Sequence, residues 1–313
     1  MNKYLVWIAV GIMAASCAGK EKREEPTENI VHVEIRDDTK TNSKHTSLKP
    51  SPVVLVLGPG AARAFVGAGV IKALEKADIE IGAIVGSEFG ALIGAMYLGS
   101  KSINEFEWKL TKLSQIKLSD RSITERILEN ASETRGQKIE NFLRKEIVKI
   151  ENSKVQLYYF NRKLSGGQKV LYKNNISSRR ITAAITDGVL VSSAASRKLG
   201  EGSAAFSEPY PVEFAHTLGI GPVIVVDSVF PEESVGKLTD IESYFLSLRD
   251  AKSASIDQLD LADAALNANK LSVGYDEFFK QKDAMYFGET LVRGMEREIS
   301  FLTGRSQFEP DYE

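Results

Sequence analysis

One short stretch of the chain has the spacing of a catalytic turn. The segment Gly86-Ser87-Glu88-Phe89-Gly90 follows an apolar run and leads into a helix of small residues. Glycines two residues before and two residues after a central residue are typical of a nucleophile elbow, because a Cβ at either position would collide with the strand or the helix. Glu88 stands at the apex, where such an elbow ordinarily presents a serine. The chemistry that this turn would serve is nucleophilic catalysis, with a carboxylate in place of the hydroxyl.

A glycine-containing loop precedes this turn. The apolar run Val53–Leu57 has the composition of a buried parallel strand and leads through Gly58, Gly60, Ala61 and Arg63 into a helical stretch. A strand, a glycine turn and a helix together present backbone N–H groups and a helix N-terminus to an anion. Because Arg63 stands where a dinucleotide-binding motif has its third glycine, we predict an anion-binding loop rather than a nucleotide site. We expect Arg63 to donate to carbonyl groups of the loops around it.

Three interpretations of Glu88 remain open on the sequence. In the first, which we favour, its carboxylate accepts hydrogen bonds from the amides of residues 60–62 and fills an inactive anion site. In the second, Glu88 is a carboxylate nucleophile whose acyl anhydride is hydrolysed with the help of Glu201 or Asp187. In the third, Ser87 is the nucleophile, one position early. The first interpretation predicts a Glu88 oxygen within hydrogen-bond range of those amides.

Composition argues against several function classes. The chain has 313 residues, 43% of them hydrophobic and 26% charged, which is enough for a full core. Its net charge of -2 gives no basis for nucleic-acid binding. Cys17 is the only cysteine, so no intrachain disulfide can form, and the sequence lacks the Cys and His spacings of a zinc site. We expect no metal and no cofactor, and we expect His216 to be packed or solvated rather than catalytic.

The first residues resemble a bacterial lipoprotein signal. Lys3 precedes an apolar run over residues 4–15, which is too short for a bilayer span of about 20 residues but fits a signal-peptide core. Small residues lie directly before Cys17, as in a lipobox, and imply cleavage before this residue followed by its lipidation. Ala18 after the cysteine favours the outer membrane, facing the periplasm. We therefore expect a lipid-anchored protein of the cell envelope.

The rest of the chain divides into a tether, one large domain and a short tail. The predicted boundaries are a signal peptide at 1–16, a lipidated flexible tether at 17–50, a domain at 51–305 and a tail at 306–313. The tether is rich in Lys, Glu, Thr, Ser and Asn, a composition that disfavours a packed core. Alternating strands and helices in the domain are typical of an α/β sandwich with a largely parallel sheet. We expect strands at 53–57, 83–86, 155–160, 169–172 and 223–227, and only helices and loops after the last of them.

The order of these motifs resembles that of bacterial patatin-like phospholipases over roughly residues 53–300. The resemblance rests on the loop from Gly58 to Arg63, on the elbow, on the pair Pro211-Val212 and on the strand at 223–227. It implies a patatin-like three-layer α/β sandwich. It also implies a Ser/Asp dyad acting on ester lipids: the elbow serine attacks the acyl carbonyl, the aspartate takes its proton and the glycine loop holds the oxyanion.

Neither chemical position of that dyad is retained. Glu88 replaces the serine, and the aspartate position, eight residues before Pro211, holds Ser203. A slip of two residues would place Glu201 there instead. We therefore predict a membrane-anchored patatin-like protein without esterase activity, which binds a lipid or acyl ligand in the cleft or an envelope protein partner. The alternatives are a lipid acyl hydrolase with a non-standard dyad that uses Glu88, and a structural lipoprotein for which the fold is only a scaffold.

Overall fold

The computed structural model describes residues 50–116, 131–147, 149–152, 154–186, 194–229 and 240–305. The chain divides into two units, Met1–Thr46 and Ser47–Glu313, and the described residues all belong to the second. Residues 1–49 with Cys17, the tail at 306–313 and Asp187 lie outside these ranges, so what the sequence predicts for them stays a prediction. In the described ranges, no helix has the length and apolarity that crossing a membrane requires.

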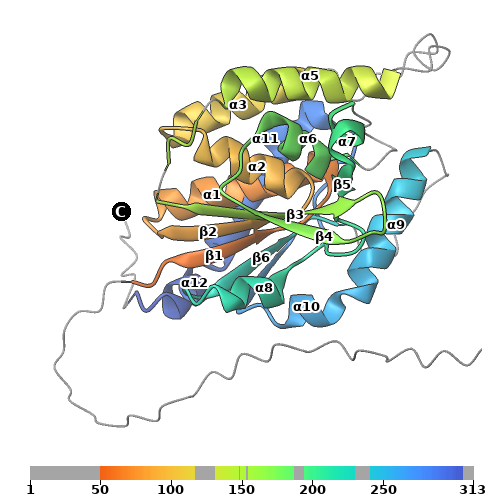
Figure 1. Ribbon diagram of the computed structural model, residues 1–313. Helices are drawn as coiled ribbons and strands as arrows, with labels where there is room; N and C mark the ends of the chain where they lie inside the picture. The colour runs from red at the N-terminus through yellow and green to blue at the C-terminus, as the bar shows by residue number, and fades with distance from the viewer. Residues whose placement is uncertain are drawn as a thin grey trace, which may run out of the picture. The chain divides into compact units, whose positions relative to one another are not determined.

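One mostly parallel sheet organises the described part of the chain (Figure 1). Its strands are β1 (Val53–Leu57), β2 (Ile81–Gly86), β3 (Gln156–Lys163), β4 (Lys169–Lys173), β5 (Glu201–Ser203), β6 (Val223–Asp227) and β7 (Ala264–Asn267). The strand order is β4-β3-β2-β1-β6-β7, and β5 pairs with β3. Strands β1, β2, β3, β6 and β7 pair in parallel, whereas β4 and β5 run antiparallel to β3. The predicted α/β class with a largely parallel sheet is confirmed.

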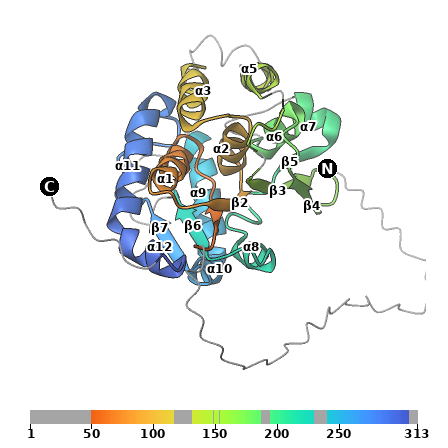
Figure 2. The ribbon, with the colours of Figure 1, turned by 90° about the vertical axis from the view of Figure 1, so that its left-hand side faces the viewer.

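Helices cover both faces of this sheet, which gives three layers (Figures 1 and 2). They are α1 (Phe65–Lys76), α2 (Phe89–Leu98), α3 (Ile103–Gln115), α5 (Ala131–Glu146), α6 (Ser178–Ala184), α7 (Ala194–Leu199), α8 (Val212–Thr217), α9 (Asp240–Ala254), α10 (Ile256–Asp260), α11 (Gln281–Gly294) and α12 (Glu296–Leu302), with short 3-10 helices η1 (Ala61–Ala64) and η2 (Phe278–Lys280). All ten residues of α2 are buried, and this helix packs on β2 and β3. On the opposite face, α8 packs against β1 and β6.

The central strands meet in register at their carboxyl ends. Leu57, the last residue of β1, pairs with Gly86 of β2, and it also pairs with Val226 of β6. All five residues of β1 are buried, as its continuous apolar run predicts. Because the carboxyl ends of parallel strands share one edge of a sheet, the loops after β1, β2 and β6 emerge together. This edge therefore brings the glycine-containing loop and the elbow side by side.

The sheet has two strands that the sequence does not predict. The pattern after Asp227 predicts only helices and loops, which is wrong for β7, a parallel strand beside β6. β7 is four residues long and buries only alternate side chains, so it lacks the continuous apolar run that marks β1 and β6. β5 is shorter still, at three residues. β3 and β4 pair as an antiparallel hairpin, and at the start of α3 Ser102 Oγ accepts a hydrogen bond from Glu105 N at 3.3 Å.

Gly69 sets how closely α1 can approach α11. A Cβ at this position would overlap the backbone carbonyl of Met285. We expect Gly69→Ala to lower the free energy of unfolding by about 1 to 3 kcal/mol through overpacking. Gly294→Ala, on α11, is the matched control: no atom lies within 4 Å of an added Cβ there, and alanine favours the helix. Urea denaturation measures both variants, and equal stabilities would show that the helices can separate without cost.

Candidate functional site

Glu88 has the strained backbone of an elbow apex. Its φ of 52° and ψ of -119° form a combination that residues other than glycine rarely adopt, and it lies directly before α2. A Cβ at Gly86 would lie 2.5 Å from Ala91 N, and one at Gly90 would overlap the carbonyl of Leu57. Both glycines are therefore required by close packing. The turn that the glycine spacing predicts is present.

The carboxylate of Glu88 contacts the loop that follows β1. Its Oε2 accepts hydrogen bonds from Gly60 N at 2.8 Å and from Ala61 N at 3.3 Å. Its Oε1 accepts a hydrogen bond from the hydroxyl of Tyr244 on α9. Glu88 is only 1% exposed, so solvent does not compete with these donors. The contact that the sequence predicts between Glu88 and the loop amides is present, and it supports the first interpretation of this residue.

The loop conformation aims these amides at Glu88. Gly60 has a φ of 150°, and Ala61, the first residue of η1, has a φ of 48°, so two successive residues have positive φ at the start of η1. A Cβ at Gly60 would lie 2.8 Å from Ser228 Oγ, and one at Gly58 would overlap the ring of Tyr210. Glycine is required at both positions for the loop to lie this close to its neighbours. The result is a fixed pair of N–H groups facing one carboxylate.

Arg63 is a structural donor beneath this loop. It is fully buried, and burial lowers the pKa of its guanidinium to about 10, while Tyr275 and Asp227 act in the opposite direction. It therefore stays protonated at neutral pH. As the sequence predicts, the guanidinium donates to carbonyl groups of neighbouring loops. At 2.7 to 2.9 Å it bonds the carbonyl oxygens of Ser228, Ala268, Leu271 and Val273.

The two candidates for the dyad aspartate position lie on β5 and are engaged locally. Ser203 Oγ accepts a hydrogen bond from Ala205 N at 3.1 Å, within its own turn. Glu201 Oε2 accepts from Asn161 Nδ2 at 2.9 Å, and Glu201 Oε1 accepts from the hydroxyl of Tyr172 at 2.7 Å. These partners belong to β3 and β4. Glu201 is thus held within the antiparallel part of the sheet. Ser203 is a serine and supplies no carboxylate at the dyad position.

Two other residues weighed on the sequence have local partners as well. Ser87 Oγ donates to the carbonyl of Glu208 at 3.1 Å, so this hydroxyl is used to hold the segment after β5. His216 is exposed on α8 and its Nε2 lies 2.9 Å from the carbonyl oxygen of Leu261. The expectation that His216 is packed or solvated agrees with this position. Neither contact is part of a nucleophile and base pair.

Tyr244 is a site residue that the sequence did not reveal. It comes from α9, far from the elbow in sequence, and it is 1% exposed. Its ring packs against Phe206 at 5.8 Å and against Tyr275 at 6.2 Å between centroids. This packing directs its hydroxyl to Glu88. No motif marks this tyrosine, because its role depends on where α9 crosses the edge of the sheet.

A second polar contact holds α9 on the same edge. Asp227, the last residue of β6, is 1% exposed, and its Oδ2 lies 2.5 Å from Lys252 Nζ on α9. The hydroxyl of Tyr210 donates to Asp227 Oδ1. Burial and this neighbouring carboxylate raise the pKa of Tyr210 well above its usual value, so the phenol stays protonated. Helix α9 is therefore tied to the carboxyl edge of the sheet at Glu88 and at Asp227.

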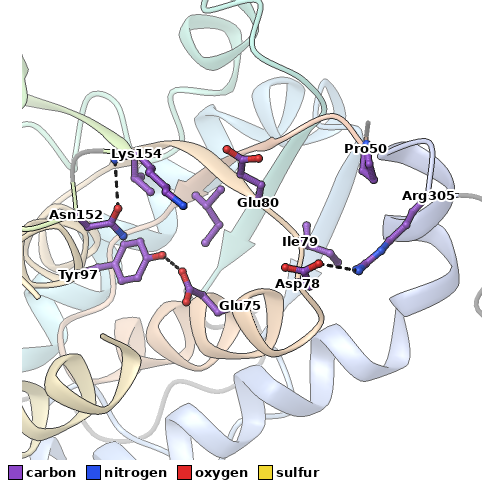
Figure 3. Close-up of a pocket in the computed structure, with 11 residues that line it drawn as sticks. Pro50, Glu75, Asp78, Ile79, Glu80, Tyr97, Asn152, Lys154 and Arg305 are labelled. Atoms are coloured by element: carbon purple, nitrogen blue, oxygen red, sulfur yellow. Dashed lines mark hydrogen bonds and ion pairs between the residues drawn. The ribbon is translucent and has the colours of Figure 1, made fainter. Parts of the chain in front are cut away.

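A hollow of about 640 Å³ lies at the opposite edge of the sheet (Figure 3). Its lining includes Ile81, where β2 begins, whereas Glu88 follows the other end of that strand. Tyr97 donates to Glu75 there, and Arg305 pairs with Asp78. None of the predicted site residues lines this hollow. Among the residues with described positions, no three His, Cys, Asp or Glu side chains are grouped to hold a metal ion.

The sequence matches a protein-family model described as patatin-like phospholipase over residues 55–281, a range that contains the glycine loop, the elbow and β5. Lysophospholipase nte1 of Aspergillus niger and that of Aspergillus oryzae are each 56% identical to the chain over 45 residues, which is 14% of this chain and 3% of each relative. Two solved structures are similar at low scores. VipD from Legionella pneumophila has a TM-score of 0.38 and 9% sequence identity, and the match covers 79% of this chain and 67% of VipD. The type III effector protein ExoU has a TM-score of 0.34 and 16% sequence identity, and the match covers 80% of this chain and 54% of ExoU.

Proposed function

The chain belongs to the patatin-like phospholipase family, and we propose that it is a member without hydrolase activity that binds a lipid or a protein partner at the cell envelope. The motifs it shares with the family imply an elbow serine and an oxyanion loop. This chain keeps the turn and the loop, but the apex is Glu88. The carboxylate of Glu88 satisfies the loop donors within the protein itself.

The hydrogen bonds from Gly60 N and Ala61 N to Glu88 Oε2 carry this proposal. Hydrolysis of an acyl ester requires free donors at the point where the oxyanion develops. Here the donors already face an oxygen of Glu88 that the chain itself holds in place. A substrate carbonyl would have to displace a buried, covalently attached ligand. Ser203 at the dyad position adds no carboxylate that could serve as base.

Attachment to the membrane is the second part of the proposal. Cys17 would carry the acyl chains, and residues 17–50 would connect them to the domain. Ala18 after the cysteine supports the outer membrane, on the periplasmic side. The bound molecule would be a lipid or acyl compound in the cleft, or an envelope protein.

Hydrolysis assays test the loss of activity. We expect the purified protein to release p-nitrophenol from a short-chain ester, and fatty acid from phospholipid vesicles, no faster than buffer does, because both chemical positions are changed. Glu88→Ala should give the same background rate. Release by the wild-type protein that disappears in Glu88→Ala, together with an acyl adduct on Glu88 in mass spectra, would instead establish a carboxylate nucleophile.

The double variant Glu88→Ser with Ser203→Asp separates lost chemistry from a closed cleft. Turnover above that of either single variant would mean that the fold still admits substrate. Mass spectrometry of any lipid that co-purifies with the wild-type protein tests the proposed lipid-binding role directly. If no lipid co-purifies with the wild-type protein and the double variant shows no turnover, the scaffold alternative is favoured.

A further inference from the structure

Three exposed aromatic side chains gather on the outer side of α3 and α11. We call Trp108, Phe279 and Tyr286 the aromatic surface; they are 53%, 72% and 66% exposed. They belong to α3, to η2 and to α11, and α3 contacts both of the other elements. Figure 2 shows α3 and α11 next to each other, with α1 beside α11 and below α3. Trp108 and Tyr286 line a common hollow of about 380 Å³. Phe279 lies in η2, two residues before Gln281, which lines the same hollow.

Each ring of the aromatic surface has a cation over its face. The distances to the ring centroids are 3.3 Å for Lys112 Nζ over Trp108, 5.9 Å for Lys280 Nζ over Phe279 and 5.7 Å for the Arg293 guanidinium carbon over Tyr286. A cation over a ring face is attracted to the ring, and its other side can stay in contact with water. The surface therefore combines aromatic rings with charged groups that reach past them into solvent.

Carboxylates balance most of these cations. Lys112 pairs with Glu146 at 2.9 Å, and Lys280 pairs with Glu277 at 2.7 Å. In the hollow, Lys72 pairs with Glu289 at 2.9 Å and also with Glu107. The aromatic surface is thus close to neutral. A strongly basic patch would attract nucleic acid or anionic lipid by charge, whereas this surface can attract a partner mainly through its rings.

We propose that the aromatic surface docks on the interface of a phospholipid bilayer. Aromatic side chains with polar or charged companions favour the headgroup level of a membrane, where the rings contact acyl chains and the cations stay hydrated beside phosphates. A protein interface would have to desolvate the ammonium groups of Lys112 and Lys280 over their rings, and lysine is depleted at such interfaces. The exposed aliphatic side chains Leu164 and Leu171 lie on the β3–β4 hairpin, on another part of the molecule.

The predicted anchor would make weak docking sufficient, and this step alone rests on the proposed lipidation of Cys17. If residues 17–50 form a flexible tether, its root-mean-square span is about 30 Å. A surface held this close to a membrane experiences it at an effective concentration in the millimolar range. Docking would then set the orientation of an attached domain, with α3 and α11 toward the lipid.

Trp108 provides a direct probe of this surface. The chain contains two tryptophans, Trp7 and Trp108, so Trp7→Phe leaves Trp108 as the single emitter. The experiment uses the full-length Trp7→Phe chain with vesicles of phosphatidylethanolamine and phosphatidylglycerol, some of them carrying acyl chains brominated near the glycerol end. We expect the emission of Trp108 to shift to the blue on vesicles and to be quenched by the brominated lipid. Added salt should leave the quenching unchanged, because the surface is nearly neutral.

Two double variants decide whether the other rings take part. Phe279→Ala with Tyr286→Ala keeps the probe and should weaken docking by about tenfold, seen as lost quenching. Leu164→Ala with Leu171→Ala removes two other exposed apolar side chains, from the hairpin, and should leave the quenching unchanged. The replaced side chains are all exposed, so thermal unfolding should show folded proteins.

The proposal is overturned by red, unquenched emission of Trp108, whether or not the chain floats with the vesicles. It is equally overturned if the Phe279 and Tyr286 variant is quenched as strongly as the parent. Flotation of the Phe279→Ala and Tyr286→Ala variant, in which docking is weakened, reports on the predicted anchor, so failure of the anchor is distinguishable from failure of the aromatic surface.

Discussion

Replacing Arg63 with methionine is expected to lower the free energy of unfolding by about 3 to 5 kcal/mol. A buried ion pair can sometimes be replaced by apolar residues without loss, because both partners are removed together. The partners of Arg63 are backbone carbonyls, which no side-chain substitution can remove. Methionine would fill part of the volume but leave these oxygens buried without donors. They belong to the loops after β6 and β7, those of Ser228, Ala268, Leu271 and Val273.

Urea denaturation of Arg63→Met against Arg293→Met measures this effect. Arg293 lies over the exposed ring of Tyr286 on α11, so its replacement should change stability by less than about 0.5 kcal/mol. Arg63→Lys retains a charge but cannot reach several carbonyls in different directions, so it should also be less stable than the wild type. If Arg63→Met and Arg293→Met unfold at the same urea concentration, the loops do not depend on the guanidinium.

Replacing Glu88 with alanine is expected to lower the free energy of unfolding by about 2 to 4 kcal/mol. The change leaves Gly60 N, Ala61 N and the hydroxyl of Tyr244 without their common acceptor in a buried site. A residue retained for catalysis commonly behaves in the opposite way, because active sites sacrifice stability for function. The sign of the change therefore distinguishes an internal ligand from a nucleophile. Thermal and urea unfolding provide the measurement.

Two further variants separate the contributions of the carboxylate and of the backbone at this position. Glu88→Gly loses the same acceptor but relieves the positive φ, so it should be about 1 kcal/mol more stable than Glu88→Ala. Acetate should raise the melting temperature of both variants and leave that of the wild type unchanged, because only the variants have an empty acceptor position. A Glu88→Ala protein as stable as the wild type would rule out the internal-ligand interpretation.

The sequence predicts the contact between Glu88 and the loop because both parts are specified locally. Glycine spacing defines the elbow, and the run at Val53–Leu57 defines the strand that precedes the loop. Parallel pairing of Leu57 with Gly86 then places the two turns on one edge. Each step needs only short-range patterns and a general rule of parallel sheets. The family resemblance adds the expected chemistry. It also identifies the two positions that differ, Glu88 in place of the serine and Ser203 in place of the aspartate.

The closing of the site by α9 could not be predicted in this way. Tyr244 reaches Glu88 from a distant segment, and its position depends on packing against Phe206 and Tyr275. The same limit applies to Glu201, because its contacts with β3 and β4 depend on the antiparallel pairing of the short strand β5 with β3. Such contacts between distant segments leave no periodic signal in the chain.

The acceptor for Gly60 and Ala61 is built into the polypeptide, and this determines how the protein can respond to its surroundings. Neither dialysis nor dilution can remove the Glu88 side chain from the position that faces the two amides. A free fatty acid would compete against a carboxylate that never diffuses away. Any lipid that the domain binds must therefore be recognised through groups other than these two amides.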